Sequence, residues 1–225
     1  MIATALRRGA EDAFVVRTDE PDLSAALPEL QYLEEGEQEF VRRFRATRLT
    51  PVIYERFAAC IQSLLAQAAR RESSPWQSSL LNIHHLLGAG GVEWLLCGSA
   101  ALAIRGVEIV PRDIDLTVAD QRRTVDALGH LLVEPPVKTE GQWIAEWFAR
   151  AWDGTRIEWV AETRADLDDA RTSDLGPEAV RRAETVSWRG LDFRVPPLDL
   201  QAAVSRERGL HDRASAIEAL SRSVS

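Results

Sequence analysis

Apolar residues in the first third of the chain recur at intervals typical of helices. Leu33, Phe40 and Phe44 follow one another at helix-like spacing among glutamate and arginine residues. A second stretch, from Val52 to Arg70, has apolar residues on one helical face, and Thr50-Pro51 just before it is a typical helix start. A third runs from about Ser78 to Leu87 and is closed by glycines. These patterns predict a helical N-terminal extension over residues 1–85, with residues 1–20 as a loose tail or packing arm.

The pattern changes after Gly91, where short apolar runs alternate with helical segments. Asp153-Gly154 lies between two apolar runs, and this dipeptide is a strong signal for a β-hairpin. Arg189-Gly190 indicates a second hairpin, and Pro196-Pro197 precedes a pair of C-terminal helices. The strands are expected at residues 93–97, 114–118, 143–152, 155–160, 185–188 and 191–195, and the helices at residues 100–105, 121–132, 177–184, 198–206 and 211–222.

The order of these elements predicts an α+β fold. Its core is a small mixed β-sheet flanked by helices, in a domain that covers residues 86–225 and ends in C-terminal helices. The helical extension over residues 1–85 precedes this domain.

Composition and charge narrow the classes of function. The net charge of −8 disfavours a protein that binds nucleic acid through a broad basic face, although it leaves room for a local basic groove. Cys60 and Cys97 are far apart and form no CxxC pair, which argues against a structural zinc site. Cys97 stands in an apolar run and is expected to be a buried thiol, while a disulfide with Cys60 stays open. No apolar run approaches the ~20 residues of a membrane-spanning helix, and no signal peptide is evident, so the expected location is the cytoplasm.

Two short motifs carry the candidate chemistry. Gly98-Ser99 lies where a predicted strand ends and a helix begins, a place where glycine lets the backbone approach a ligand and free N–H groups can meet a phosphate. Asp113 and Asp115 stand two residues apart at the start of a strand, so their side chains share one face. Adjacent carboxylates repel each other unless a cation lies between them, and their hard oxygens suit Mg²⁺ or Mn²⁺. Each motif alone is common in proteins. The two together, on neighbouring strand ends, are a more specific indication of a site that binds both phosphate and metal.

In this combination the sequence resembles the nucleotidyltransferase superfamily, with its DNA polymerase beta-like fold. The signature of the superfamily is Gly-Ser, a helix, and then Asp-x-Asp on the second strand. The sequence around these two motifs looks most like that of the minimal, antibiotic-modifying and toxin-type members. The resemblance is strong from Leu95 to Val118 and extends more weakly to Asp212.

The resemblance implies roles for individual residues. Asp113 and Asp115 would hold the metal ions, and a third carboxylate is expected on a later strand. Glu158 is the candidate for it, although the family usually has aspartate there, and Glu162 is a weaker alternative. Gly98 and Ser99 would hold phosphates of the nucleotide. Arginines that would contact phosphate are Arg105 and Arg112. Many relatives also carry a lysine near Val204, and either Arg206 or Arg208 would take its place here.

The resulting prediction is a metal-dependent nucleotidyltransferase that transfers a nucleoside monophosphate from an NTP to a hydroxyl by two-metal catalysis. A small-molecule acceptor is favoured because the chain is acidic. Two alternatives stay open: a toxin-type enzyme that acts on RNA or protein, and a catalytically weak binding module. A homodimer or an antitoxin is a possible protein partner, and no membrane partner is expected.

Overall fold

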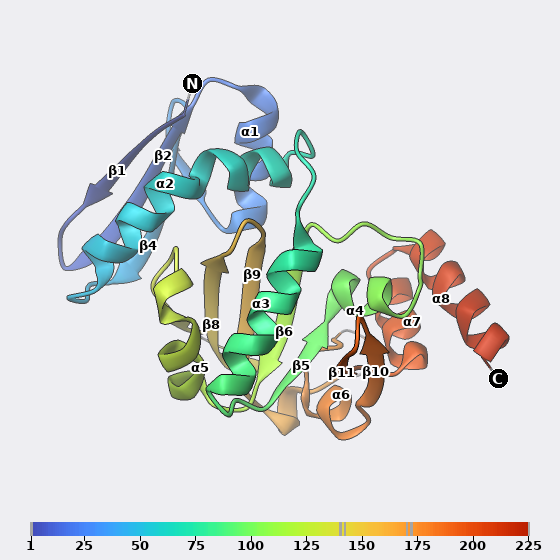
Figure 1. Ribbon diagram of the computed structural model, residues 1–225. Coiled ribbons are helices and arrows are strands. Elements are labelled where there is room, and N and C mark those ends of the chain that lie inside the picture. The colour runs from blue at the N-terminus through green and yellow to red at the C-terminus, as the bar shows by residue number, and fades with distance from the viewer. Residues whose placement is uncertain (1, 140, 142, 170, 172, 225) are drawn as a thin grey trace.

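The protein is described from a computed structural model, which covers residues 2–139, 141, 143–169, 171 and 173–224. It has the predicted α+β architecture, with helices packed around small β-sheets (Figure 1). A sheet near the N-terminus lies at one end of the molecule, a mixed sheet lies in the middle, and the C-terminal helices lie at the other end. None of the helices in the described ranges is long and apolar enough to cross a membrane.

The central sheet has five strands in the order β5-β6-β9-β8-β7. The strands β6 and β9 run parallel, and the other neighbours are antiparallel, so the sheet is mixed as predicted. The bounds of its strands are β5 Trp94–Cys97, β6 Asp113–Val118, β7 Val137–Lys138, β8 Ala145–Trp152 and β9 Arg156–Thr163.

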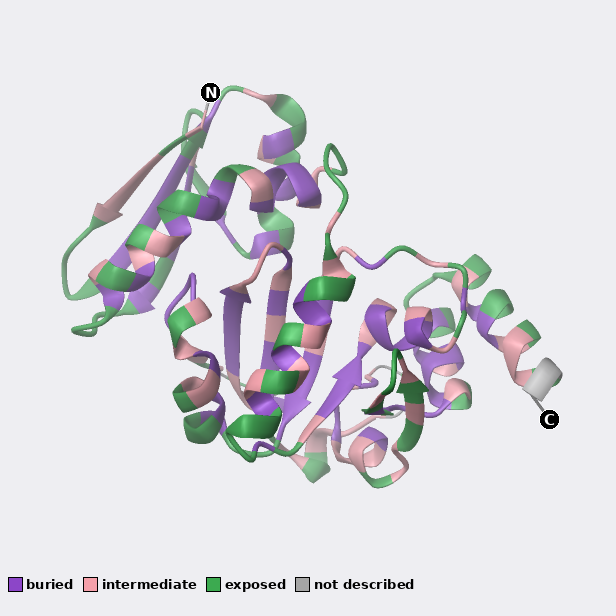
Figure 2. Cartoon of the chain, in the orientation of Figure 1, coloured by how far each residue is buried: buried purple, intermediate pink, exposed green. Residues whose placement is uncertain are grey.

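Both faces of the central sheet are covered, and its strands are mostly buried (Figure 2). On one face, Leu95 and Cys97 of β5 pack against helices α6 (Pro177–Arg181) and α7 (Leu198–Glu207), whereas Leu96 faces the main core on the other side. This double burial explains why β5 is an unbroken apolar run rather than an alternating one. The helices around the sheet are α3 Trp76–Ala89, α4 Gly98–Ile104, α5 Gln121–Leu128, α6 Pro177–Arg181, α7 Leu198–Glu207 and α8 His211–Val224.

Both predicted hairpins form. The turn at Asp153-Gly154 joins the antiparallel strands β8 and β9, and Gly154 has φ +73°, a conformation that favours glycine. Arg189-Gly190 joins β10 Glu184–Trp188 to β11 Leu191–Val195 in a two-stranded sheet.

The prediction that residues 1–85 are wholly helical is wrong for residues 2–45. This segment forms an antiparallel sheet in the order β1-β2-β4-β3, here called the N-terminal sheet. The described residues before Pro21 are therefore not a loose tail, because they contain two strands of this sheet. Its strands are β1 Ile2–Arg7, β2 Glu11–Thr18, β3 Leu33–Gly36 and β4 Glu39–Arg45, with α1 Pro21–Ala26 and a short 3₁₀ turn at Pro28–Leu30 between β2 and β3.

The spacing of β4 misled the prediction for a physical reason. Phe40 and Phe44 are four residues apart, an even number that fits the period of a strand as well as that of a helix. Between them on the core side lies Arg42, which is 7% exposed and whose guanidinium lies over the Phe44 ring. A charged residue on the buried face hides the alternation of apolar and polar positions by which a strand is recognised.

The predicted helices that follow are present as α2 Thr50–Ala68 and α3. They join the N-terminal sheet to the central sheet in one hydrophobic core, which contains Phe14, Phe57, Ile83 and Trp159. The predicted boundary between residues 85 and 86 falls inside α3.

Phe57 tests how far the N-terminal sheet depends on this core. Its side chain is 1% exposed, and its ring lies 5.0 Å from that of Phe14 and 5.9 Å from that of Tyr32. Phe57→Ala should lower the free energy of unfolding by about 3–5 kcal/mol because it leaves a cavity between α2 and the sheet. Urea denaturation followed by circular dichroism measures the change.

The matched control is Leu33→Ala, since Leu33 is 69% exposed and should change stability by no more than about 0.5 kcal/mol. Equal effects of the two substitutions would show that α2 does not hold the N-terminal sheet through Phe57.

Candidate metal and nucleotide site

The structure brings three carboxylates together at one end of the central sheet. Asp113 and Asp115 lie on β6, and the parallel pairing of β6 with β9 sets Asp115 opposite Glu158. Each residue contributes an oxygen to a group whose members all lie within 4.8 Å of one another. The i, i+2 spacing on β6 and the register of the two strands put all three side chains on one face.

Burial and mutual repulsion both act on this group of carboxylates. Burial raises the pKa of Asp115 well above the 3.8 of an exposed aspartate, and the negative charges of Asp113, Glu158 and Asp174 raise it further. Burial also acts to raise the pKa of Glu158, but the nearby guanidinium of Arg150 and a second arginine outweigh it, so this pKa lies below its usual value. A cation among the carboxylates would remove the repulsion that Asp115 experiences.

Arg156 supplies part of the missing positive charge. Its guanidinium pairs with Asp113, and its Nε lies 3.6 Å from Glu158 Oε1. Its charge also acts to lower the pKa of Asp115, but burial and the neighbouring carboxylates outweigh it, so this pKa stays raised. The oxygen-only donor set and the excess of negative charge fit a hard divalent cation, so Asp113, Asp115 and Glu158 could hold Mg²⁺ or Mn²⁺.

The turn between β5 and α4 is fitted closely to these carboxylates. Gly98 has φ +60°, and a Cβ on it would overlap the carboxylate of Asp115 and lie 3.2 Å from its Cγ. The Gly98 N–H donates to Asp174 Oδ2 at 3.3 Å, and its carbonyl accepts from Gln201 Nε2 at 3.3 Å. Glycine is required here both by the backbone and by the approach of Asp115. Because its N–H is already bonded, Gly98 holds the turn, while Ser99 faces the adjoining cleft.

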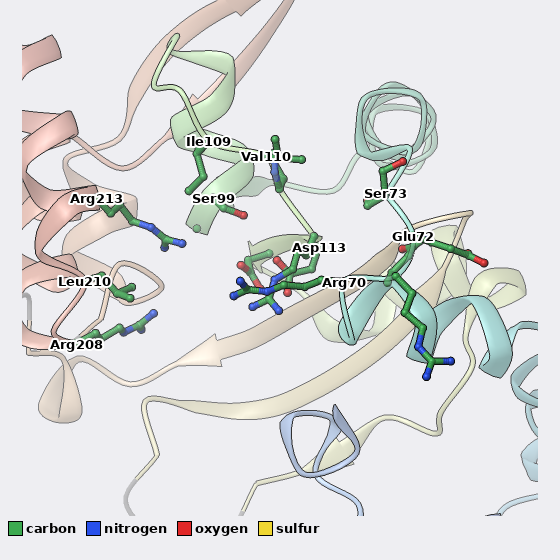
Figure 3. A pocket seen from close by; sticks show the side chains of 17 residues that line it. Arg70, Glu72, Ser73, Ser99, Ile109, Val110, Asp113, Arg208, Leu210 and Arg213 are labelled. Atoms are coloured by element: carbon green, nitrogen blue, oxygen red, sulfur yellow. The ribbon is translucent and has the colours of Figure 1, made fainter. Parts of the chain in front are cut away.

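A cleft of about 750 Å³ opens above the carboxylates, with Asp113, Asp115, Gly98 and Ser99 in its lining. Figure 3 shows Arg208 and Arg213 on one side of it and Ser73 on the other, with Asp113 between them. The cleft thus has an acidic floor on β6 and basic walls from the end of α2, the loop before β6 and the α7–α8 turn. The arginines of these walls include Arg70, Arg112, Arg208 and Arg213.

Not every residue predicted to act at this site lies there. Arg105 is not among the residues that line the cleft; its guanidinium bonds Glu184 at 2.6 Å and the Pro196 carbonyl at 3.0 Å. Glu162 lies at the far end of β9 and accepts a hydrogen bond from Trp147.

Sequence reasoning also missed several charged residues of the site. Arg156 could have been found, because it stands two residues before Glu158 and so shares its face of the strand, as Asp113 does with Asp115. Arg70 entered the sequence analysis only as the end of the second helical stretch; it has φ +61° just beyond α2 and lines the cleft. Arg213 and Asp174 come from distant elements, and no local pattern marks them.

Comparisons with known proteins give limited matches. No protein family and no curated protein matches the sequence. Among solved structures, a Thermotoga maritima protein whose assignment as a nucleotidyltransferase is itself provisional matches 66% of this chain and 93% of its own, with 17% identity and a TM-score of 0.48. The structure of ANT(2″)-Ia in complex with adenylyl-2″-tobramycin matches 66% of this chain and 99% of its own, with 12% identity and a TM-score of 0.38. Similarity this low does not assign an activity to this chain.

Gly98→Ala tests the fit of the β5–α4 turn, and Gly91→Ala is its matched control. Both glycines have φ +60°, but a Cβ on Gly91 would meet nothing within 4 Å. Each substitution should cost about 1–2 kcal/mol of stability from backbone strain. Only Gly98→Ala should also displace Asp115 and abolish Mn²⁺ binding, measured by electron paramagnetic resonance. Unchanged Mn²⁺ binding in Gly98→Ala would contradict this account of the turn.

The raised pKa of Asp115 predicts how stability depends on pH without metal. The folded protein holds a proton on Asp115 more tightly than the unfolded chain, so this contribution is complete below about pH 3.8 and is lost as the pH rises through the raised pKa. Mg²⁺ can take the place of the proton, so the difference between melting temperatures with Mg²⁺ and with EDTA should widen as pH rises.

Asp115→Asn provides the control, because an amide neither titrates nor repels its neighbours. Melting curves in EDTA should show that this variant lacks the part of the pH dependence that comes from Asp115. A variant that follows the wild-type curve at every pH would contradict the prediction.

Proposed function

We propose that the protein is a metal-dependent nucleotidyltransferase that transfers a nucleoside monophosphate from an NTP to a hydroxyl of a small-molecule acceptor. The observation that carries this proposal is the charge arrangement of one cleft, in which Asp113, Asp115 and Glu158 meet at the floor and arginines line the walls. A triphosphate with divalent cations is a ligand that needs both features at once. The resemblance of the Gly98-Ser99 and Asp113-x-Asp115 motifs to the nucleotidyltransferase signature supports the same reaction.

The residues of the cleft would divide the work. Arg70, Arg208 and Arg213 would bind and orient the triphosphate from the two walls, since guanidinium groups suit phosphate oxygens. Ser99 would donate a hydroxyl hydrogen bond to a phosphate. Asp113, Asp115 and Glu158 would hold Mg²⁺, which when bound stabilises negative charge on the phosphoryl group and aligns the reacting oxygens.

The reaction itself is a displacement at phosphorus. The acceptor oxygen forms a bond to the α-phosphorus, the bond from that phosphorus to the bridging oxygen breaks, and pyrophosphate leaves with the electron pair. The hydroxyl proton passes to a base or to water. The chain's contribution would be position and charge, which are the largest sources of rate in phosphoryl transfer.

A small acceptor is favoured by charge. The net charge of −8 gives little support for a long polyanion across the surface, whereas the arginines concentrate positive charge inside one cleft. The three assembled carboxylates support catalysis over a binding module, because a module without metal chemistry has no physical need for adjacent like charges.

Calorimetric titration of each NTP in the presence of Mg²⁺ tests the proposal. Wild type should bind at least one NTP in a metal-dependent manner, and Asp113→Asn/Asp115→Asn should lose this binding because its site can no longer hold the ions. With a binding NTP identified, pyrophosphate release in an acceptor screen should detect turnover that the double variant lacks.

The control is Asp126→Asn/Asp166→Asn, which removes the same charge from two exposed aspartates outside the cleft and should bind as wild type does. If no NTP binds, or the Asp113/Asp115 variant binds equally well, the proposed function is wrong.

A further inference from the structure

A series of buried charged groups extends from the N-terminal sheet to Glu158. It begins with Arg42 on β4 and Tyr32 beside that strand, continues through Glu134 and Arg150, and ends at Glu158 on β9. Four of its members alternate in sign, so Glu134 lies between Arg42 and Arg150, and Arg150 lies between Glu134 and Glu158. The series connects a region with no assigned role to the candidate metal site.

Every contact in the series is close. Arg42 Nη1 lies 2.8 Å from Glu134 Oε2, and the Tyr32 hydroxyl donates to Glu134 Oε1 at 3.1 Å. Arg150 Nη1 lies 2.7 Å from both oxygens of Glu134, and Arg150 Nε donates to Glu158 Oε1 at 2.7 Å. The side chains of Arg150, Glu134 and Arg42 are only 1%, 2% and 7% exposed.

Stability alone does not explain so many buried charges. Removing ions from water costs several kcal/mol each, and apolar residues of similar volume often serve a core as well or better. Arg150 is also bound by the Leu30 carbonyl at 3.0 Å, as Arg42 is at 2.8 Å, so the N-terminal region fixes both guanidiniums. The arrangement is better explained by what it holds in place.

What it holds is the orientation of Glu158. The closest contact of each arginine to this side chain is to Oε1, from Arg150 at 2.7 Å and from Arg156 at 3.6 Å. Among the described residues no hydrogen bond is donated to Oε2, so this oxygen can bind an ion. Glutamate has one more rotatable bond than aspartate, so a glutamate ligand needs more restraint to keep one geometry. A guanidinium that bonds Glu134 and Glu158 at once provides that restraint, because its donors have a fixed planar geometry.

We propose that Arg150 is a positioning residue for Glu158 and that the N-terminal sheet, through Arg42, Tyr32 and Glu134, forms the outer support of the metal site. This inference rests on the proposed function, because it treats Glu158 as a metal ligand. It assigns residues 2–45 a role in metal affinity that the hydrophobic core alone would not give them.

Arg150→Lys tests the proposal without changing any charge. A lysine ammonium cannot reproduce the planar, two-sided contact with Glu134 and Glu158, so Mn²⁺ affinity should fall about 10-fold, as expected for groups that orient metal ligands. Mn²⁺ binding to the full chain is measured by electron paramagnetic resonance, with circular dichroism to establish that each variant is folded.

A double-mutant cycle separates positioning from a general structural effect. If Arg150 acts through Glu158, Arg150→Lys should weaken Mn²⁺ binding in the wild type and add almost nothing in a Glu158→Gln background. The same loss in both backgrounds would show a merely structural role and overturn the proposal.

Arg42→Lys and Arg43→Lys form a matched pair for the N-terminal sheet. The two arginines are neighbours on β4, but Arg43 is exposed and pairs with Glu35. Arg42→Lys should weaken Mn²⁺ binding and Arg43→Lys should not. Tyr32→Phe removes only the hydroxyl that is bonded to Glu134, and it should also weaken Mn²⁺ binding. This variant takes the place of Arg150→Lys if Arg150→Lys does not fold.

The outcomes distinguish the two proposals. If wild type binds no Mn²⁺ at this site, the proposed function fails and this inference fails with it. If wild type binds Mn²⁺ but Arg150→Lys, Arg42→Lys and Tyr32→Phe all bind equally tightly, only the positioning role is overturned.

Discussion

The repulsion between three carboxylates is the constraint on which the rest of the structure depends. Asp113, Asp115 and Glu158 offer oxygens within 4.8 Å of one another, and burial makes their mutual repulsion stronger than it would be in water. Arg156 pairs with Asp113 and Arg150 pairs with Glu158, but the pKa of Asp115 stays raised despite the charge of Arg156. The fold thus holds a local excess of negative charge whose natural complement is a divalent cation.

The remaining parts of the chain can be understood as surroundings for that charge. The floor comes from neighbouring strands whose register is set by backbone pairing, and it therefore has a fixed geometry. The basic walls come from the end of α2 and the α7–α8 turn, which lie far apart in sequence. Fixed acidic groups with basic groups on surrounding elements suit a ligand that is both phosphorylated and metal-bound.

How much of the site could be predicted from the sequence depends on the range of the interactions involved. Asp113-x-Asp115 and Gly98-Ser99 were visible because their geometry follows from adjacent residues on one strand and one turn. Glu158 was found because the resemblance implies a third carboxylate on a later strand, and the Asp153-Gly154 turn indicated where that strand begins. Arg70 and Arg213 were missed since only the packing of distant helices brings them to one cleft. Arg105 was predicted to contact phosphate from its sequence position alone, but Glu184 and the Pro196 carbonyl hold its guanidinium outside the cleft.

The N-terminal sheet was mistaken for helix for a reason that also bears on its role. A strand with Arg42 between Phe40 and Phe44 on its buried face is unfavourable in isolation, because an unpaired buried charge is costly. It becomes acceptable only when Glu134, which is remote in sequence, supplies the opposite charge. The residue that hides the strand pattern is thus the one that joins the sheet to Arg150 and Glu158. Had β4 served only to cover the core, an apolar residue at position 42 would have packed there without this requirement, so the local irregularity is better explained by the site than by the fold.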